Sequence, residues 1–357
     1  MQKTIHIGAG LLAQKDFFTR YIDGHQVMIV TQKSIAAFYL ETLQKNLTDY
    51  QCDVFFLPEG ERYKTLHEAE KVVDKLLEKN HDRHTTLIAL GGGIVGDITG
   101  FIAACYQRGV NYLQIPTTLI AQVDSAIGGK TGVNHARAKN SIGVFYQPKG
   151  VIADIDTLKT LPRREFIAGL AEVIKYALIC DADFFHWLEE NTAAILNKNS
   201  EALSRIIHTC IKHKLRFVEQ DEKDRGVRQL LNFGHTFGHA LETALAYQRL
   251  LHGEAVAMGI VMASELSAEC DLISRDDVLR IRRLLESSGL SLSCDILPRA
   301  ADLLSVMKKD KKNRGGKIQF ILLKKIGKAI RAEEIAEEKV LKVIKNYPRE
   351  KSCSRGL

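Results

Sequence analysis

Three histidines and one glutamate stand in settings that suit a metal ion. His235 and His239 are four residues apart, so they project from one face of a helix, and His252 opens a later helical stretch. Glu172 lies among apolar residues of another helical stretch, where a buried carboxylate needs a partner. Two histidines and one glutamate form a common ligand set of catalytic zinc. Spacing alone leaves open which two histidines bind.

Each of these residues could instead have a purely structural role. A single histidine is more often structural than a ligand. Lys175 follows Glu172 by three residues on the same helix face, so the two could form only a buried ion pair. Three histidines and a glutamate in apolar, glycine-flanked settings nevertheless favour a metal site.

A run of glycines could bind phosphate. Gly91, Gly92 and Gly93 follow an apolar run typical of a strand, and an apolar helix begins directly after them. Glycines let backbone N–H groups approach a pyrophosphate, and the positive end of the helix dipole adds to the attraction. Asp97 is a carboxylate in the first turn of that helix. The pattern favours phosphate binding over a turn that only packs the helix on the sheet.

An earlier glycine motif fits a nucleotide less well. Gly8 and Gly10 begin a G-x-G-x-x-A pattern after a short strand at residues 4–7. The dinucleotide fingerprint also needs an acidic residue at the end of the next strand, and that strand ends at Thr31 without one. We therefore expect a tight turn at this motif.

A third motif resembles half of a phosphate-binding loop. Gly129 and Lys130 precede a threonine, but Asp124 stands where the full motif needs its first glycine. Nucleotide hydrolysis is therefore not expected. Three polar side chains of this region could still contact phosphate: Lys130, Lys139 and Asn140.

The elements that position these groups change character along the chain. Up to residue 160, short apolar runs alternate with helical stretches, which predicts a parallel sheet with helices on both faces. We expect strands at residues 26–31, 53–57, 85–90 and 112–115, and helices at residues 34–44 and 66–79. Beyond residue 160 we expect helices at residues 164–178, 201–218, 235–246, 254–270 and 276–288, with two short strands near residues 317–323.

Composition excludes several classes of protein. Hydrophobic residues are 45% and charged residues 26% of the 357, the balance of a folded globular protein. The net charge of +7 comes without an arginine-rich block, so we expect no nucleic-acid partner. The seven cysteines are scattered, which favours a reducing compartment. No apolar run approaches the about 18 residues of a membrane span, and we expect a cytoplasmic protein with no membrane partner.

Several segments resemble the 3-dehydroquinate synthase family, in the family's order and across most of the chain. They are Gly-Gly-Gly-Ile-Val-Gly-Asp from Gly91, Tyr-Gln-Arg-Gly-Val from Tyr106, Gln-Ile-Pro-Thr-Thr from Gln114, Val-Asp-Ser from Val123, Gly-Gly-Lys-Thr-Gly-Val-Asn-His from Gly128, Gly-Leu-Ala-Glu-Val-Ile-Lys-Tyr from Gly169, Leu-Asn-Phe-Gly-His-Thr-Phe-Gly-His-Ala from Leu231 and Leu-His-Gly-Glu-Ala-Val-Ala from Leu251. The glycine-rich turn alone would also suit the wider polyol dehydrogenase superfamily.

The resemblance implies a fold and a reaction. The fold class is α/β plus α: a Rossmann-like parallel-sheet domain that binds NAD, residues 1–160, and a mainly helical domain that binds metal and substrate, residues 161–357, with the site in the cleft between them. The enzyme would convert 3-deoxy-D-arabino-heptulosonate 7-phosphate to 3-dehydroquinate and phosphate, using NAD and Zn²⁺ or Co²⁺. Transient oxidation makes a neighbouring C–H acidic, phosphate leaves, the hydride returns, and an aldol step closes the ring.

The resemblance also implies residue roles. Glu172, His235 and His252 match the metal ligands, whereas His239 matches a substrate-phosphate contact. Substrate would meet Asp124, Lys130, Asn140, Lys175, Lys214, Arg228, Asn232 and His239, and Arg108 would reach into the neighbouring subunit of a homodimer. NAD would contact Glu59, Gly60, Glu61, Arg62, Tyr63, Lys64, Gly93, Ile94, Val95, Gly96, Asp97, Thr117, Thr118, Lys130, Lys139, Thr157, Leu158, Lys159 and Thr160. Either Lys311 or Lys312 would add a phosphate contact.

The substrate implied by the resemblance is anionic at both ends. Lys214 and Arg228 suit its carboxylate, since a guanidinium binds a carboxylate through two hydrogen bonds. A related cyclase acting on sedoheptulose 7-phosphate would not need this cationic pair. A polyol dehydrogenase would release NADH, and a nucleotide-binding module without activity would not explain the glutamate and histidines.

Overall fold

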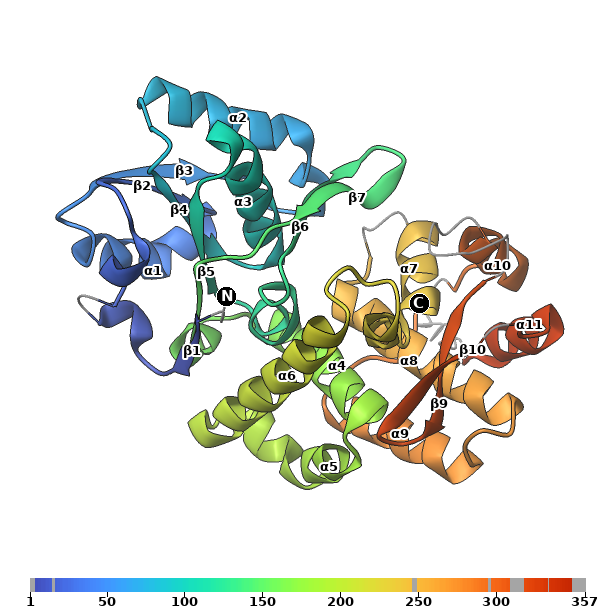
Figure 1. Ribbon diagram of the computed structural model, residues 1–357. Helices are drawn as coiled ribbons and strands as arrows, with labels where there is room; N and C mark the ends of the chain where they lie inside the picture. The colour runs from blue at the N-terminus through green and yellow to red at the C-terminus, as the bar shows by residue number, and fades with distance from the viewer. Residues whose placement is uncertain are drawn as a thin grey trace, which may run out of the picture. The chain divides into compact units, whose positions relative to one another are not determined.

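The computed structural model describes residues 4–14, 17–245, 249–294, 297–308, 318–332 and 334–348. The chain separates into two compact units. The first comprises Met1–Pro162 and Lys198–Val218, and the second comprises Arg163–Asn197 and Glu219–Leu357. The expected α/β plus α fold class is confirmed, because the first unit holds a parallel sheet and the second is mainly helical (Figure 1).

A six-stranded sheet forms the centre of the first unit. Its order is β1-β8-β5-β4-β2-β3, and every neighbouring pair is parallel. The carboxyl ends of all six strands therefore meet at one edge, where ligands of open α/β sheets bind. The strands are β1 (Thr4–Gly8), β2 (Gln26–Thr31), β3 (Gln51–Phe56), β4 (Thr86–Gly91), β5 (Asn111–Pro116) and β8 (Gly150–Asp154).

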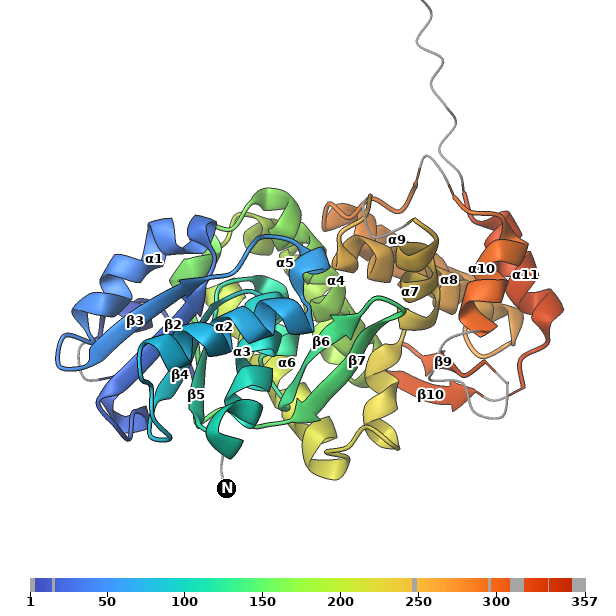
Figure 2. The ribbon, with the colours of Figure 1, turned by 90° about the horizontal axis from the view of Figure 1, so that it is seen from above.

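Helices cover both faces of this sheet because alternate strand residues point in opposite directions. Met28 and Val30 of β2 pack with α2 (Leu66–Glu78) and α3 (Gly93–Cys105). Their neighbours Val27 and Ile29 pack on the opposite face, with α1 (Lys33–Lys45). Figure 2 shows α1 and α2 on opposite sides of β2 and β3.

A two-stranded hairpin and α6 complete the first unit. β6 (Lys130–His135) pairs antiparallel with β7 (Ala138–Phe145), and α6 spans Ser200–Gln220. The hairpin was not expected, since β7 is largely exposed and its sequence does not alternate apolar and polar residues. Short turns of 3-10 or π-helix connect these elements: η1 (Leu11–Ala13), η2 (Thr19–Tyr21), η3 (Glu61–Tyr63), η4 (Tyr106–Arg108), η5 (Ala121–Ser125) and η6 (Ile155–Lys159).

The second unit packs around α8 (His252–Glu269). This helix is buried on nearly all sides and contacts α4, α7, α9, α11 and strand β9. The other elements are α4 (Arg163–Cys180), α5 (Ala182–Leu196), η7 (Val227–Asn232), α7 (His235–Ala244), α9 (Arg275–Ser287), α10 (Ala300–Lys308), β9 (Phe320–Lys325), β10 (Lys328–Ala332) and α11 (Glu337–Asn346). Within the described ranges, no helix is long and apolar enough to cross a membrane.

Glycines let α8 approach its neighbours closely. A Cβ on Gly259 would stand 2.1 Å from the backbone oxygen of Gly234, just before α7. A Cβ on Gly253 would stand 1.9 Å from the backbone oxygen of Ala168 in α4. These approaches set the spacing of α4, α7 and α8, the helices that carry Glu172, His235 and His252.

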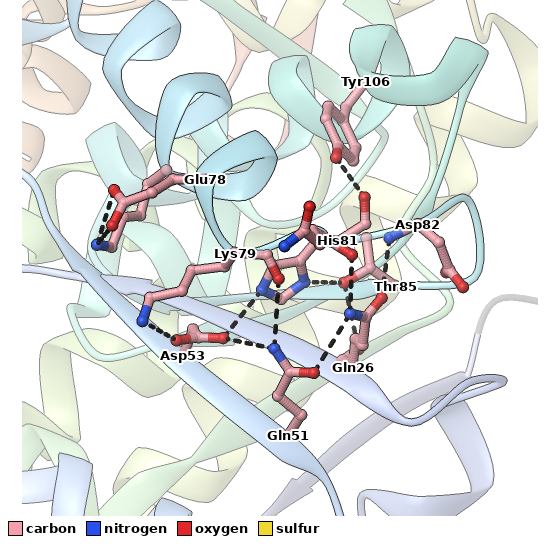
Figure 3. Close-up of polar contacts among 11 residues, drawn as sticks. Gln26, Gln51, Asp53, Glu78, Lys79, His81, Asp82, Thr85 and Tyr106 are labelled. Carbon is pink, nitrogen blue, oxygen red and sulfur yellow. Dashed lines mark hydrogen bonds and ion pairs between the residues drawn. The ribbon is translucent and has the colours of Figure 1, made fainter.

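A polar cluster joins the amino ends of the strands, opposite the ligand edge (Figure 3). His81 Nδ1 lies 2.7 Å from Thr85 Oγ1, and His81 Nε2 lies 3.2 Å from Asp53 Oδ2. The Tyr106 hydroxyl donates to the His81 backbone oxygen over 2.5 Å. Thr85 is fully buried, and its contact with His81 ties the residues before β4 to the amino ends of β2 and β3. Burial lowers the pKa of His81, against the opposing effect of Asp53.

The close contact between α7 and α8 predicts different costs for two similar substitutions. Gly259→Ala should destabilise the protein by about 1–3 kcal/mol, because backbone must move to admit the new methyl group. Gly238→Ala should cost less, because its Cβ would stand 3.0 Å from Ala255 O, which requires a smaller backbone shift, and the about 1 kcal/mol by which alanine favours the helix offsets part of that cost. Thermal unfolding of both variants measures this difference in stability. Equal unfolding temperatures of the two variants would contradict the prediction.

The buried His81 predicts acid sensitivity. The pKa of His81 is lower in the folded chain than its usual 6.5, so the unfolded chain binds the proton more readily. The contribution of His81 to stability should be complete above pH 6.5 and should be lost as the pH falls through the folded pKa. The stability difference between wild type and His81→Gln, from urea unfolding, should therefore shrink between about pH 8 and about pH 5.

The control for this experiment is His67→Gln, which removes a solvent-exposed histidine of α2. This variant should follow the wild-type pH dependence. A difference between wild type and His81→Gln that stays constant or grows toward acid would contradict the prediction.

Candidate active site

The glycine turn lies at the carboxyl edge of the sheet, between β4 and α3. Gly91 ends β4, Gly92 caps α3, and Gly92, Gly93 and Ile94 remain partly exposed. A Cβ on Gly93 would stand 2.8 Å from the Ser125 hydroxyl, so the turn leaves no room for a side chain. The first N–H groups of a helix have no partner within the helix and attract anions. The turn can therefore hold a phosphate against backbone.

Two buried hydroxyl groups beside this turn are unsatisfied. Thr117 Oγ1, directly after β5, and Ser125 Oγ, in η5, make no hydrogen bond with the described residues. A buried hydroxyl without a partner costs free energy. Both atoms suit a polar ligand at the glycine turn.

The earlier glycine motif is a structural turn, as expected. The backbone N–H groups of Gly10 and Leu12 donate to the two carboxylate oxygens of Asp154, over 3.0 and 2.8 Å. Asp154 is buried at the end of the neighbouring strand β8. The amides that a nucleotide would need are therefore already used.

A buried lysine links the glycine helix to the hairpin. Lys64 Nζ donates to Asp97 Oδ2 over 2.5 Å and to Asn140 Oδ1 over 2.6 Å. Burial alone would lower the pKa of Lys64, but the carboxylates of Asp97 and Glu61 raise it above its usual value. Lys64 therefore stays charged, and Asp97 and Asn140, two predicted ligand contacts, are held by one cation.

A second buried lysine lies in α6. Lys214 Nζ donates to Asp124 Oδ1 over 2.8 Å and to the Asp124 backbone oxygen over 2.5 Å. The structure thus brings together two residues predicted to meet the substrate, although they are far apart in sequence.

The remaining residues predicted in the first unit lie in its loops and turns, in helix α3 and in the β6–β7 hairpin. Gln122 is buried and its amide donates to Thr157 Oγ1 over 3.0 Å, which fixes η6. Arg108 is exposed with a left-handed backbone, φ 66°. Glu59, Gly60, Glu61, Arg62 and Tyr63 follow β3; Val95 and Gly96 lie in α3; Thr118 follows β5; Lys130 and Lys139 lie in β6 and β7; Leu158, Lys159 and Thr160 lie in or just after η6.

The second unit brings Glu172, His235 and His252 together. Glu172 Oε1 lies 3.4 Å from His235 Nε2 and 3.7 Å from His252 Nε2. One ligand atom from each of the three residues lies within 4.8 Å of the others, close enough to hold a metal ion. The three come from α4, α7 and α8, so the fold rather than a local motif assembles the group.

The charge of Glu172 is balanced by Lys175. Both are buried, and their side chains form an ion pair. Burial alone would raise the pKa of Glu172, but Lys175 and then His235 hold it well below its usual range. Apart from this ion pair, neither Glu172 oxygen accepts a hydrogen bond from the described residues. An ionised carboxylate with unsatisfied oxygens suits a cation.

The surroundings shift the pKa values of the two histidines of this group in opposite directions. Burial lowers the pKa of His235, which favours the neutral ring that a metal needs. Burial also disfavours charge on His252, but Glu172 and Glu242 raise its pKa to about 9. A metal at this position would therefore displace a proton from His252.

Sequence reasoning missed Glu242, which lies beside this group. Glu242 Oε1 is 3.4 Å from His252 Nδ1, and Glu242 forms a second possible ligand group with His239 and His252. The sequence did contain a signal for Glu242. Residues 235, 239 and 242 have the spacing that places them on one face of a helix. His239 lies next to both histidines, with ring centroids 5.2 Å from His235 and 5.9 Å from His252.

Arg228 and Asn232 lie in η7, before α7. Asp221 holds this turn by accepting three backbone N–H groups, including that of Arg228 over 3.1 Å. The Arg228 side chain is buried and donates to the Glu222 backbone oxygen over 2.7 Å. The predicted phosphate contacts Lys311 and Lys312 lie outside the described residues.

Comparison with known proteins identifies the family. The sequence profile of the 3-dehydroquinate synthase N-terminal domain matches residues 54–168, and that of the C-terminal domain matches residues 169–313. The 3-dehydroquinate synthase of Nitrosococcus oceani is 50% identical over 326 residues, which cover 91% of each chain.

Solved structures of sugar phosphate cyclases share the fold. The 2-epi-5-epi-valiolone synthase of Streptomyces hygroscopicus subsp. jinggangensis, with NAD⁺ and Zn²⁺ bound, has a TM-score of 0.89 at 26% identity, with 97% of each chain covered. A 2-deoxy-scyllo-inosose synthase complexed with carbaglucose-6-phosphate, NAD⁺ and Co²⁺ has a TM-score of 0.87 at 25% identity, with 96% of each chain covered. By its sequence and its fold, the chain belongs to the 3-dehydroquinate synthase family.

Proposed function

We propose that the chain is an enzyme that converts 3-deoxy-D-arabino-heptulosonate 7-phosphate to 3-dehydroquinate and phosphate, in the biosynthesis of aromatic compounds. The likeness to 3-dehydroquinate synthases along nearly the full length of both chains carries this proposal. The reaction is a lyase reaction without net oxidation, because the hydride removed from the substrate is returned to it.

NAD and Zn²⁺ or Co²⁺ are the proposed cofactors. The partly exposed glycine turn and the unsatisfied hydroxyls of Thr117 and Ser125 fit a nucleotide phosphate. The ionised, buried Glu172 and the ring nitrogens of His235 and His252 fit a divalent metal. When bound, the metal acidifies a substrate hydroxyl as a Lewis acid, and NAD accepts and returns the hydride.

The first unit supplies cations that are already oriented. Asp124 holds the Lys214 ammonium in place by two hydrogen bonds, and we assign Lys214 to the substrate carboxylate. Lys130 and Asn140 are assigned to the substrate phosphate. Lys64 fixes Asp97 and Asn140 beside the glycine turn, which keeps both groups in one arrangement before ligands bind.

The second unit supplies the metal ligands and further anion contacts. Lys175 keeps Glu172 ionised in its buried setting, so that the carboxylate is ready to bind a cation. Arg228, presented by the turn that Asp221 organises, and Asn232 are assigned to the substrate carboxylate. His239 is assigned to the phosphate. A phosphate oxygen of the substrate itself accepts the proton removed beside the transient ketone.

The working form is proposed to be a homodimer in the cytoplasm, with Arg108 serving the site of the neighbouring subunit. Arg108 is exposed and held by a left-handed turn, which suits a contact with another chain. The described cysteines form no disulfide, in keeping with a reducing compartment.

The direct test mixes the protein with the heptulosonate phosphate, NAD and Zn²⁺ or Co²⁺. We expect equal amounts of phosphate and dehydroquinate, because each turnover expels one phosphate and closes one ring. Absorbance should show no accumulation of NADH, since the hydride returns to the substrate. Sedoheptulose 7-phosphate is the control, and it should react far more slowly because it lacks the carboxylate. Accumulating NADH, or a preference for the control substrate, would contradict the proposal.

Replacing Glu172 should change both the metal affinity and the stability of the protein. Glu172→Gln should lower metal affinity and turnover by at least about a hundredfold, since even outer-shell changes cost 10–100-fold. It also leaves the Lys175 ammonium buried without its counter-charge, which should cost about 3–5 kcal/mol of stability. Isothermal titration with Zn²⁺ and thermal unfolding measure the two effects.

A matched double variant resolves the two effects. Glu172→Gln with Lys175→Met removes both buried charges, so much of the lost stability should return. Its affinity for Zn²⁺ should stay as low as in the single variant. Wild-type affinity in the double variant would rule out Glu172 as a ligand.

A further inference from the structure

Glu242 is a buried carboxylate for which the proposed reaction has no role. It is 4% exposed and lies on α7, on the face that also carries His235 and His239. Burial of a carboxylate is costly unless a partner compensates it. Its Oε1 atom lies 3.4 Å from Nδ1 of His252.

The ring of His252 lies between two carboxylates. Its Nε2 atom faces Glu172 Oε1 at 3.7 Å, while its Nδ1 atom faces Glu242 Oε1 at 3.4 Å. A neutral imidazole binds a metal through one nitrogen only when its proton sits on the other. The group that accepts this proton therefore decides which nitrogen is available.

We propose that Glu242 is a positioning residue that accepts the Nδ1–H hydrogen bond of His252 and so fixes the ring with Nε2 toward the metal. The inference rests on the proposed metal site formed by Glu172, His235 and His252. Carboxylates in this position orient a histidine ligand and increase its basicity.

His235 shows the same arrangement with a different acceptor. Its Nε2 atom faces Glu172 Oε1 at 3.4 Å, and its Nδ1 atom lies 3.1 Å from the backbone oxygen of Phe233. Both histidines thus direct Nε2 toward the same carboxylate and place Nδ1 beside an oxygen acceptor. Glu172 in turn is held by Lys175, so each of the three proposed ligands has an outer partner.

A different arrangement would make Glu242 a ligand. Glu242, His239 and His252 also bring ligand atoms within 4.8 Å of one another, and a metal there would bind Nδ1 of His252. The Glu172 group is favoured because Glu172 and His235 are both buried and both Nε2 atoms converge on one carboxylate. The two arrangements predict that different ring nitrogens of His252 bind the metal.

The first experiment measures Zn²⁺ affinity by competition with a chromophoric chelator. Glu242→Gln keeps an oxygen acceptor but loses the charge, so its affinity should fall by about tenfold. Glu242→Ala loses the acceptor, so its affinity should fall by about a hundredfold. Both variants should still bind one ion per chain. The matched control is Glu265→Gln, which removes a carboxylate of α8 that pairs with the exposed Arg275 and should bind zinc as wild type does.

The outcomes separate this inference from the proposed function. Unchanged zinc affinity in both Glu242 variants would contradict the proposed role of Glu242 but would leave the proposed metal site intact. Complete loss of zinc binding in Glu242→Gln, instead of a tenfold fall, would make Glu242 a ligand and overturn the inference. A wild-type chain that binds no zinc would sink the proposed metal site, and the inference with it.

A second measurement needs no variant and therefore does not depend on how Glu242 substitutions fold. Histidine labelled with ¹⁵N reports which ring nitrogen carries a proton and which binds the metal. In the zinc-loaded wild type, His252 should show a protonated Nδ1 and a metal-bound Nε2. A metal-bound Nδ1 would overturn the inference.

Discussion

The ion pair between Glu172 and Lys175 is the constraint on which the rest of the second unit depends. A carboxylate buried in a helical core is tolerated only with a compensating charge, and Lys175 provides it from the next turn of the same helix. The pair keeps Glu172 ionised, and the ionised carboxylate draws the Nε2 atoms of His235 and His252 toward one point. The contacts of α8 at Gly253 and Gly259 let three helices meet there without intervening side chains.

The first unit applies the same principle to other lysines. Lys64 is held by Asp97 and Lys214 by Asp124, and both lysines are buried. A lysine buried alone would lose its proton, whereas a paired lysine keeps its charge and a fixed direction. An anionic substrate then meets cations that are already desolvated and oriented, which reduces the entropy cost of binding.

Much of this architecture could be predicted from sequence because its signals are local. The strand at residues 26–31 and the helix at residues 66–79 have clear patterns. The structure confirms the strand as β2 with the same bounds and the helix as α2, which ends one residue earlier. The turn at Gly8 was also foreseen from the missing acidic residue. The β6 and β7 hairpin was not, because its exposed strand has no apolar face.

The site was harder to predict because three helices build it. Spacing within α7 suggested that His235 and His239 could bind one metal together, but Glu172 lies nearest to His235 and His252, and the latter comes from α8. Sequence separation hides such contacts, and the family resemblance rather than spacing singled out His252. Glu242 escaped notice because a lone glutamate within a helix looks like a solvated residue until its burial is known.

The assignment of Lys198–Val218 to the first unit has a consequence for the order of folding during synthesis. The chain passes between the two units three times, after Pro162, after Asn197 and after Val218. A ribosome must therefore release α4, α5 and α6 before the first unit has all its parts. The Lys214 partner of Asp124 is thus made only after the second unit's first segment, and neither unit is a single uninterrupted stretch of chain.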